Sequence, residues 1–303
     1  VKISKSASMG NGIVLHADDY LDYLGQDPHT KVIAMYLEGV PNAQRLFHLM
    51  LEIGREKPIV LWKGGQTEEG ARAVQSHTAS LAASTALWQA AARQANALWA
   101  DSFDETLDLV KALCMLKEPK GPRLGLVAMT GGQSVVITDA FSKVGLQVPL
   151  LSPASYQELA TFYSTVGGSF RNPMDMTPTS RNLDLVRRVL DILARDENLD
   201  AICYELNMAF AARGEGAVER LIDLIGEFRG AYPRPFLCVL SAMHREVEAL
   251  AVRQALAQRG VPAFPSFQRA ANAYKKVWDY YRERREREAT RHVPVPVAPA
   301  HPG

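Results

Sequence analysis

The stretch that decides the fold is residues 31–64, KVIAMYLEGVPNAQRLFHLMLEIGREKPIVLWKG. It holds two short apolar runs, at 31–39 and 58–62, and each run is bounded by Gly or Pro. Between them, residues 42–57 have helical periodicity and begin with an Asn, a residue that favours helix starts. Continuous apolar strands joined by an amphipathic helix are typical of a parallel sheet covered on both faces. The stretch therefore predicts an α/β fold.

The same alternation continues through the rest of the chain. Further strands are predicted at 97–101, 124–129, 199–206 and 235–240, with a short edge strand at 261–264, and amphipathic helices separate them. A loop is expected at 63–78 and helices at 80–96, 103–118 and 267–286. The Pro/Gly break at 119–123 suggests a boundary. We expect one domain over 1–118, a second over 119–286, and a Pro-rich tail over 287–303.

Composition narrows the class of protein. The 303 residues are 47% hydrophobic and 22% charged, with a net charge of +1, which provides no broad field to attract nucleic acid or an anionic membrane. No apolar run is long enough for a membrane span, and the first residues do not resemble a signal peptide. Cys114, Cys203 and Cys238 lie far apart in apolar segments and are expected to be buried free thiols in a reducing cytoplasm, and no metal site is predicted.

One candidate site is the segment TGGQS, which follows the predicted strand at 124–129. Gly131 and Gly132 allow the backbone to approach a ligand closely, and a helix opens at Gln133 and Ser134. The free N–H groups of a helix start attract phosphate or carboxylate. The spacing fits neither GxGxxG nor GxxxxGK[ST], so a strand-to-helix turn that binds nothing is an equal alternative.

A second candidate is His77, within SHTASLAAS at 76–84. A lone His beside a helix start is more often a capping or packed residue than a catalytic one. However, the strand at 31–37 delivers Glu38 to the sheet edge where His77 is also expected. A carboxylate bonded to one ring nitrogen fixes the tautomer and leaves the other nitrogen free as a nucleophile or base.

Two further segments have structural explanations as their default. In SFRNPMDMT, at 169–177, Asn and Asp flank a Pro and readily form a turn, although Arg171, Asn172 and Asp175 could line a ligand pocket. Residues 4–11 are expected to form a strand and a turn. Asp18 and Asp19 are expected to be helix-start carboxylates, because no third metal ligand stands at a suitable spacing.

Several of these segments, taken in order, resemble the NDP-forming acyl-CoA synthetases, relatives of the succinyl-CoA synthetase α subunit. The matching segments are ASMGN, ADDYLDYLGQDPHTKVIAMYLEG, KPIVLWKGGQTEEGARAVQSHTASLAA, VAMTGGQSVVITDAF, GSFRNPMDMT and PSFQRAANAYKKVWDYY. Together they cover roughly residues 2–285. The resemblance implies two successive flavodoxin-like domains, each a parallel sheet with helices on both faces.

The resemblance also implies a set of roles. His77 would carry a phosphoryl group between an acyl phosphate and a nucleotide, with Glu38 bonded to its imidazole. The implied phosphate-binding residues are Ser76, Thr78, Gly131, Gly132, Gln133 and Ser134, and Asn172 and Asp175 are possible substrate-binding residues. The overall reaction would be acyl-CoA + NDP + phosphate ⇌ carboxylic acid + NTP + CoA. Coenzyme A and ADP/ATP would be substrates, and Mg²⁺ would accompany the nucleotide.

The chain also departs from this family. The family's CoA-binding Rossmann domain, its ATP-grasp module and a first strand with an SQSG turn have no counterpart here, so we expect partner domains or subunits in a homo- or hetero-oligomer. Ala79 and Ala83 replace two family glycines, which narrows the room for a phosphate. A non-catalytic homologue, acting as an assembly or acyl-CoA-binding subunit, is therefore the alternative. A nicotinamide or flavin oxidoreductase is poorly supported, because the GxGxxG pattern and its acidic ribose partner are absent.

Overall fold

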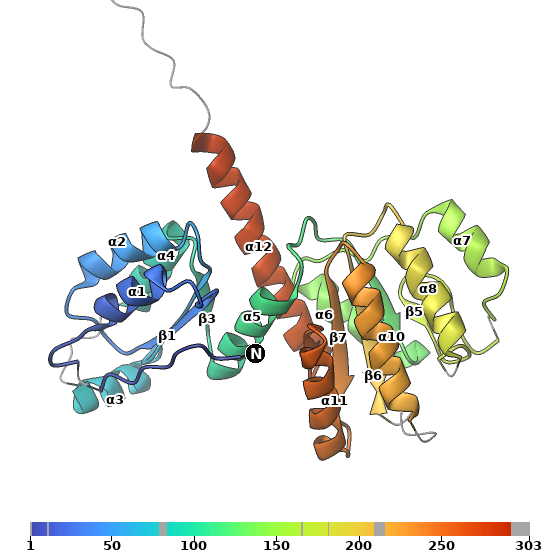
Figure 1. The fold of residues 1–303 in the computed structure, drawn as a ribbon, viewed down its shortest axis with the longest axis horizontal. Coiled ribbons are helices and arrows are strands. Elements are labelled where there is room, and N and C mark those ends of the chain that lie inside the picture. Colours follow the sequence, from blue (N-terminus) through green and yellow to red (C-terminus); the bar gives the residue numbers. More distant parts are fainter. Residues whose placement is uncertain are drawn as a thin grey trace, which may run out of the picture.

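The computed structural model contains two parallel sheets that follow one another along the chain (Figure 1). It describes residues 2–10, 12–78, 84–164, 166–180, 182–208 and 216–291, and of these the side chains of 75–78, 207 and 291 are not described. Every pairing between named strands is parallel, and helices cover the sheets. The predicted α/β class is confirmed.

The first unit is built on a three-stranded sheet in the order β1-β2-β3. Its elements are α1 (Ala17–Gln26), β1 (Ile33–Leu37), α2 (Ala43–Ile53), β2 (Ile59–Lys63), α3 (Glu68–Thr78), α4 (Thr85–Gln94), β3 (Leu98–Ala100) and α5 (Phe103–Met115). Successive side chains of β2 face opposite sides of the sheet. Leu61 packs in one apolar layer with α1, α2 and α4, whereas Val60 packs in the other with α5. The strand order follows the chain order, so among the described residues β1 is an edge strand.

The second unit is built on a five-stranded sheet in the order β5-β4-β6-β7-β8. Its elements are β4 (Leu124–Ala128), α6 (Gly131–Lys143), α7 (Pro153–Ala160), β5 (Met174–Asp175), α8 (Leu183–Arg195), β6 (Ala201–Asn207), α10 (Ala217–Ala231), β7 (Phe236–Ser241), α11 (Glu246–Gln258) and β8 (Ala263–Phe264). This is the flavodoxin-like order, in which the chain moves outward from β4 in one direction and then in the other. Ligands of such sheets bind beyond the carboxyl ends of the strands at this reversal, which here lies between β4 and β6.

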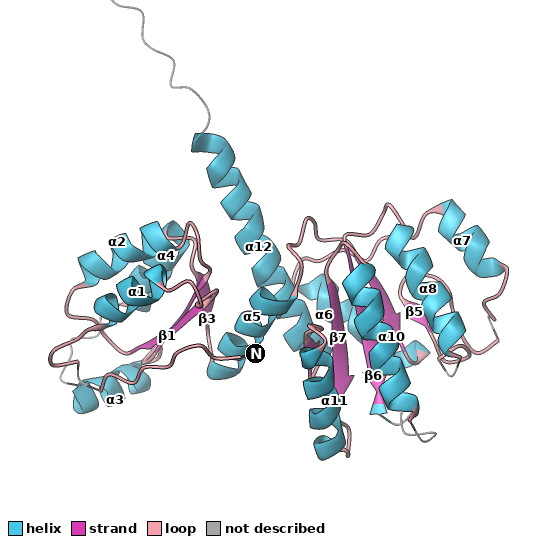
Figure 2. Cartoon of the chain, in the orientation of Figure 1, coloured by secondary structure: helices cyan, strands magenta, loops and turns pink. Residues whose placement is uncertain are grey.

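The last helix, α12 (Phe267–Arg291), lies with α5 between the two sheets (Figure 2). One apolar cluster includes Val60 of β2, Leu109 of α5, Leu126 of β4 and Tyr274 of α12. The apolar core is therefore continuous across the predicted boundary at 118/119. Lys276 of α12 also donates to the Trp99 carbonyl on β3 at 2.9 Å, so the helix satisfies a backbone group of that strand.

A buried ion pair joins α5 to α12. The carboxylate of Asp108, which is 2% exposed as a residue, accepts from Arg269 Nε at 2.5 Å and from Nη2 at 3.0 Å. Removing Arg269 leaves the buried Asp108 carboxylate with Lys111, at 3.3 Å, as its remaining cationic partner. We expect Arg269→Ala to lower the free energy of unfolding by about 2 kcal/mol, measured by urea denaturation. Arg195→Ala, which breaks an exposed pair with Glu158, is the control and should change it by less than about 1 kcal/mol.

Several local expectations were wrong. The predicted loop at 63–78 contains helix α3, whose polar sequence provides only Val74 as a buried apolar residue among its described side chains and so has little apolar periodicity. Residues 2–10 contain no strand. The turn in the segment 169–177 contains the two-residue strand β5, which hydrogen-bonds as a strand despite its length. Helix α7 was not expected.

The carboxyl-terminal helix continues five residues past the predicted end at 286, so the predicted tail from 287 begins too early. Pairs four residues apart, such as Arg284–Glu288 at 3.0 Å, support this extension. Residues 292–303 lie outside the described part of the chain. Cys203 and Cys238 are buried as expected, but Cys114 is exposed.

Candidate functional site

The first candidate site lies at the carboxyl ends of β1 and β2. Leu37 pairs with Lys63 in register, so Glu38, the residue after β1, lies beside the end of β2. The Tyr36 hydroxyl donates to Glu38 Oε1 at 3.1 Å and holds that carboxylate at the sheet edge. Burial and this hydrogen bond raise the pKa of Tyr36. Glu38 therefore stands where the sequence places it, as a half-buried carboxylate at the end of a parallel strand.

Lys63 was not predicted as a site residue. Lys63 is only 1% exposed. Its Nζ donates to the Gly64 carbonyl and lies 6.0 Å from the centre of the Trp88 ring of α4. Burial lowers the pKa of Lys63, and the nearby charge of Glu38 opposes that shift. The edge thus combines a buried cation with a carboxylate on the neighbouring strand.

Two glycines after β2 determine how closely helix α3 approaches this edge. A Cβ added to Gly64 would lie 2.5 Å from Tyr36 Oη and 3.1 Å from Glu38 Cγ. Gly65 has a φ of +72°, and a Cβ there would lie 2.9 Å from Cγ2 of Val74 on α3. A side chain at either position would clash, so only glycine fits. The two glycines therefore let α3 pack against the loop beside Glu38.

The predicted phosphate carrier lies at the end of α3. Ser76, His77 and Thr78 form the last turn of this helix, and their side chains are outside the described part of the structure. Ala79 and Ala83 lie outside the described residues altogether, and the helix expected at 80–96 begins at Thr85, capped by Ser84. The pairing of His77 with Glu38 stays a prediction.

The second candidate site is the start of α6, at the reversal point of the larger sheet. Thr130 is the N-cap, and its hydroxyl accepts from the Gln133 N–H at 3.2 Å. The first helical hydrogen bond runs from the Ser134 N–H to the Thr130 carbonyl. The N–H groups of Gly131 and Gly132, in the first turn, therefore have no partner within the helix. Both glycines are exposed, and a Cβ on Gly132 would meet nothing within 4 Å. The first turn of this helix is therefore exposed.

A buried carboxylate that the sequence analysis missed lies directly beneath this turn. Glu205, near the end of β6, is 0% exposed, and its carboxylate accepts from the Met129 N–H at 3.0 Å and from the Gln133 side-chain amide. Burial raises its pKa to about 7, although the bond from Met129 works in the opposite direction. A signal was present, because both the 31–38 strand and the β6 strand carry a Glu at the carboxyl end.

Asp175 is the second carboxylate at this helix start. Its Oδ1 accepts from the Thr177 N–H at 3.0 Å and from the Thr177 hydroxyl at 2.6 Å. Its Oδ2 lies 3.3 Å from where a Cβ on Gly131 would be. An anion bound at this turn would meet two carboxylates, and it would favour the protonated form of Glu205.

Asn172 has a structural role. Its side-chain oxygen accepts from the Leu126 N–H at 2.9 Å, and its amide donates to the carbonyls of Leu124 at 2.9 Å and Pro149 at 2.8 Å. The side chain is buried and ties the turn, which contains a cis Asn172–Pro173 bond, to strand β4. These contacts favour the turn interpretation for Asn172.

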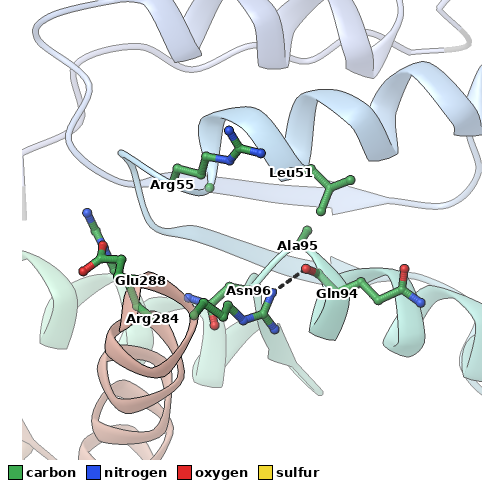
Figure 3. A pocket seen from close by; sticks show the side chains of 9 residues that line it. Leu51, Arg55, Gln94, Ala95, Asn96, Arg284 and Glu288 are labelled. Atoms are coloured by element: carbon green, nitrogen blue, oxygen red, sulfur yellow. Dashed lines mark hydrogen bonds and ion pairs between the residues drawn. The ribbon is translucent and has the colours of Figure 1, made fainter. Parts of the chain in front are cut away.

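The pocket shown in Figure 3 lies at the other end of the first sheet. Its lining comes from the ends of α2 and α4, which precede β2 and β3, and from α12: Leu51, Gly54, Arg55, Gln94, Ala95, Asn96, Arg284, Arg287 and Glu288. Arg287 donates to the Gln94 carbonyl at 2.6 Å across it. The pocket belongs to the packing of α12 and contains none of the candidate residues.

The described ranges contain no cluster of three His, Cys, Asp or Glu side chains that could hold a metal ion. In the same ranges, no helix is both long and apolar enough to cross a membrane.

The buried carboxyl of Glu205 predicts a pH dependence of stability. Because its pKa is about 7 in the folded protein and 4.5 is its ordinary value, the folded state binds more protons between these values. Stability from this group is complete below about pH 4.5 and is lost as the pH rises through 7, by roughly 3 kcal/mol. Glu205→Gln should remove that loss in urea titrations at pH 5, 6, 7 and 8. The exposed Glu227→Gln is the control, and an unchanged pH profile in Glu205→Gln would contradict the assignment.

The chain is similar to known proteins in family, in sequence and in structure. Residues 1–113 match the family model described as a succinyl-CoA ligase like flavodoxin domain. The α subunit of an ADP-forming acetate–CoA ligase II from Pyrococcus furiosus is 31% identical over 267 residues, which are 87% of this chain and 56% of that subunit. The α subunit of ligase I from the same organism is 29% identical over 92% of this chain and 59% of that subunit.

A solved structure of an acetyl-coenzyme A synthetase is also similar to this chain. An acetyl-coenzyme A synthetase 1 from Ca. Korarchaeum cryptofilum, in complex with phosphate and ADP, superposes with a TM-score of 0.78 at 28% identity. The match covers 95% of this chain and 61% of that one. The chain therefore spans little more than half the length of these relatives.

Proposed function

The chain belongs to the NDP-forming acyl-CoA synthetase family, and from this premise we propose that it is the part of such an enzyme in which His77 carries a phosphoryl group. The reaction runs in three steps. Phosphate displaces CoA from the acyl-CoA to give an acyl phosphate. His77 takes the phosphoryl group and releases the carboxylic acid, and an NDP then takes it from phosphohistidine to give NTP.

The observation that carries the proposal is the position of Glu38. Its carboxylate stands at the end of β1, beside the loop that packs α3, and His77 lies in the last turn of that helix. A carboxylate that accepts from one imidazole nitrogen directs the other nitrogen at phosphorus and stabilises the positive charge that develops on the ring. In this proposal Ser76 and Thr78 bind phosphate oxygens next to His77.

The start of α6 supplies the second phosphate contact in this proposal. The open N–H groups of Gly131 and Gly132 would face the phosphoryl group, and Asp175 would border the same site. The Gln133 and Ser134 side chains are bonded to Glu205 and to the Thr130 carbonyl, so they would support this turn from beneath. Protonation of Glu205 would reduce repulsion of the incoming anion. CoA and ADP or ATP are the proposed co-substrates, and both would be held mainly by partner domains.

The proposed partners are CoA-binding and ATP-grasp domains or subunits, with Mg²⁺ bound together with the nucleotide in the ATP-grasp module. The two Pyrococcus furiosus relatives named above are called α subunits, which supports an assembly of more than one chain. The free cysteines support a reducing compartment, and we propose the cytoplasm.

The alternative is a non-catalytic homologue that acts as an assembly or acyl-CoA-binding subunit. Ala79 and Ala83, which stand in the place of two family glycines, favour it, because each adds a methyl group close to His77 in the sequence. Such a protein would bind its partner or an acyl-CoA without taking up phosphate.

The test is reconstitution with an ATP-grasp partner and a CoA-binding partner, followed by synthesis of ATP from acetyl-CoA, ADP and phosphate. The proposal predicts ATP that appears only when this chain is present. Partner binding by sedimentation, with no ATP at any acyl-CoA tested, would support the non-catalytic alternative and contradict the proposal.

A further inference from the structure

One carboxylate oxygen at the start of α6 has no role in the proposed reaction. Asp175, the last residue of β5, is 7% exposed, and its Oδ1 accepts from the N–H of Thr177 at 3.0 Å and from its hydroxyl at 2.6 Å. In the described part of the chain, Oδ2 accepts no hydrogen bond. A largely buried carboxylate oxygen without a donor is costly, so Oδ2 needs a donor from solvent or from a ligand.

The contacts of Asp175 fix the direction of this oxygen. The residue pairs in register with Ala128 of β4, and its N–H donates to the Ser169 carbonyl at 2.8 Å. The two bonds from Thr177 then hold Oδ1. Oδ2 lies 3.3 Å from where a Cβ on Gly131 would be, so the open oxygen stands beside the first turn of α6.

The first turn of α6 supplies hydrogen-bond donors next to this acceptor. The N–H groups of Gly131 and Gly132 have no partner within the helix, and both residues are exposed. Thr130 is the N-cap, and within the described ranges neither glycine N–H donates to Asp175, which therefore flanks the helix start without capping it. Glu205 is 0% exposed and bonded beneath the turn, so Asp175 provides the carboxylate oxygen that a ligand here would touch.

Free N–H groups beside a carboxylate oxygen recognise a particular kind of ligand. The N–H groups attract the oxygens of an anion, as helix starts do for phosphate. An ionised carboxylate can only accept, so the ligand must also present a hydrogen to Asp175. Hydrogen phosphate, HPO₄²⁻, has acceptor oxygens and a P–O–H group, whereas sulfate, SO₄²⁻, has the same shape and charge but no hydrogen. Sulfate would leave Oδ2 unpaired and would place two like charges in contact.

We propose that Asp175 is a specificity-determining residue for inorganic phosphate. Its Oδ2 accepts from the P–O–H group, while the N–H groups of Gly131 and Gly132 donate to the other phosphate oxygens. This inference rests on the proposed function, in which inorganic phosphate is a substrate and binds at this turn. The site accepts phosphate that carries a proton and rejects tetrahedral dianions that carry none.

The experiment measures binding of ³²P-labelled inorganic phosphate to the chain assembled with its ATP-grasp and CoA-binding partners. Equilibrium dialysis at pH 8, with sulfate as the competitor, gives the two affinities. In the wild type, sulfate should bind about 10²-fold more weakly than phosphate. In Asp175→Asn the side-chain oxygen can still accept from Thr177, but an amide N–H₂ replaces the open oxygen, and the preference should fall below about 5-fold.

The matched control is Asp139→Asn. It removes an exposed carboxylate further along α6, which is paired with Lys143 at 3.6 Å, and it should keep the wild-type preference. A second variant, Asp175→Ser, serves where Asp175→Asn unfolds at a lower urea concentration than the wild type. Its hydroxyl can accept from the Thr177 N–H in place of Oδ1, and it should lose the preference as well.

The ratio of the two affinities separates recognition from a structural role. If Asp175 only stabilised the turn, its replacement would weaken phosphate and sulfate binding equally. That result would overturn the inference, as would absence of phosphate binding, equal binding of both anions by the wild type, or an unchanged preference in both Asp175 variants. Selective binding of phosphate without synthesis of ATP from acetyl-CoA and ADP would contradict the proposed function and leave the assignment of Asp175 standing, so the two failures are distinguishable.

Discussion

Replacing Glu38 by Gln is expected to slow phosphorylation of His77 by about 10²–10⁴-fold. The amide can still accept the hydrogen bond from Tyr36, which is 3.1 Å long in the native protein, so the local geometry should survive. What the variant loses is the negative charge that stabilises the imidazole as it becomes positive. Glu38 is half-buried, and the fold should therefore keep its stability.

The measurement is the initial rate of phosphoenzyme formation from labelled ATP and the ATP-grasp partner. Glu56→Gln, an exposed change near the amino end of β2, is the control and should label at the wild-type rate. If Glu38→Gln also labels at the wild-type rate, Glu38 is not the partner of His77 and the first site has been misassigned.

The second large effect concerns His77. Replacement of His77 by Ala should reduce ATP synthesis from acetyl-CoA, ADP and phosphate by more than about 10³-fold, because in the proposed reaction His77 carries the phosphoryl group to the nucleotide. In the proposed reaction, the first half does not use the imidazole. Release of CoA and formation of acetyl phosphate should therefore continue in the variant.

The two halves can be measured separately, with a thiol reagent for CoA and hydroxylamine for acetyl phosphate. His48→Ala is the control, since His48 lies on the exposed face of α2. Loss of both halves in His77→Ala would contradict a pure carrier role, and continued ATP synthesis would contradict any role for His77 in the transfer.

Strands β2, β4, β6 and β7 could be predicted because they are buried on both faces. The pattern in β2, β4, β6 and β7 is a continuous apolar run, and each run is followed by an amphipathic helix or a glycine turn. Helix α3 could not be predicted in the same way, because among its described side chains only Val74 is buried, and its position depends on the close approach of Gly65. Tertiary packing, not periodicity, forms that helix.

The site was predictable only in part. Glu38 and the open turn at Gly131 and Gly132 follow from strand ends and glycine chemistry, and both lie where expected. Lys63 and Glu205 were missed because their importance depends on burial, which only the folded sheets create. Both stand at or near the last residue of an apolar strand, and a polar residue at that position is the signal to look for in such sequences.

The most direct test of the central claim is the chemistry and location of the covalent phosphate. The wild-type chain, incubated with γ-³²P-ATP, Mg²⁺ and its ATP-grasp partner, should take up a label that is lost in acid and stable in base, as expected of an N-phosphorylated imidazole. Peptide mapping under alkaline conditions should place it on His77 alone, and addition of ADP should remove it as ATP. A label that is absent, acid-stable, or equally strong in His77→Ala would contradict the account.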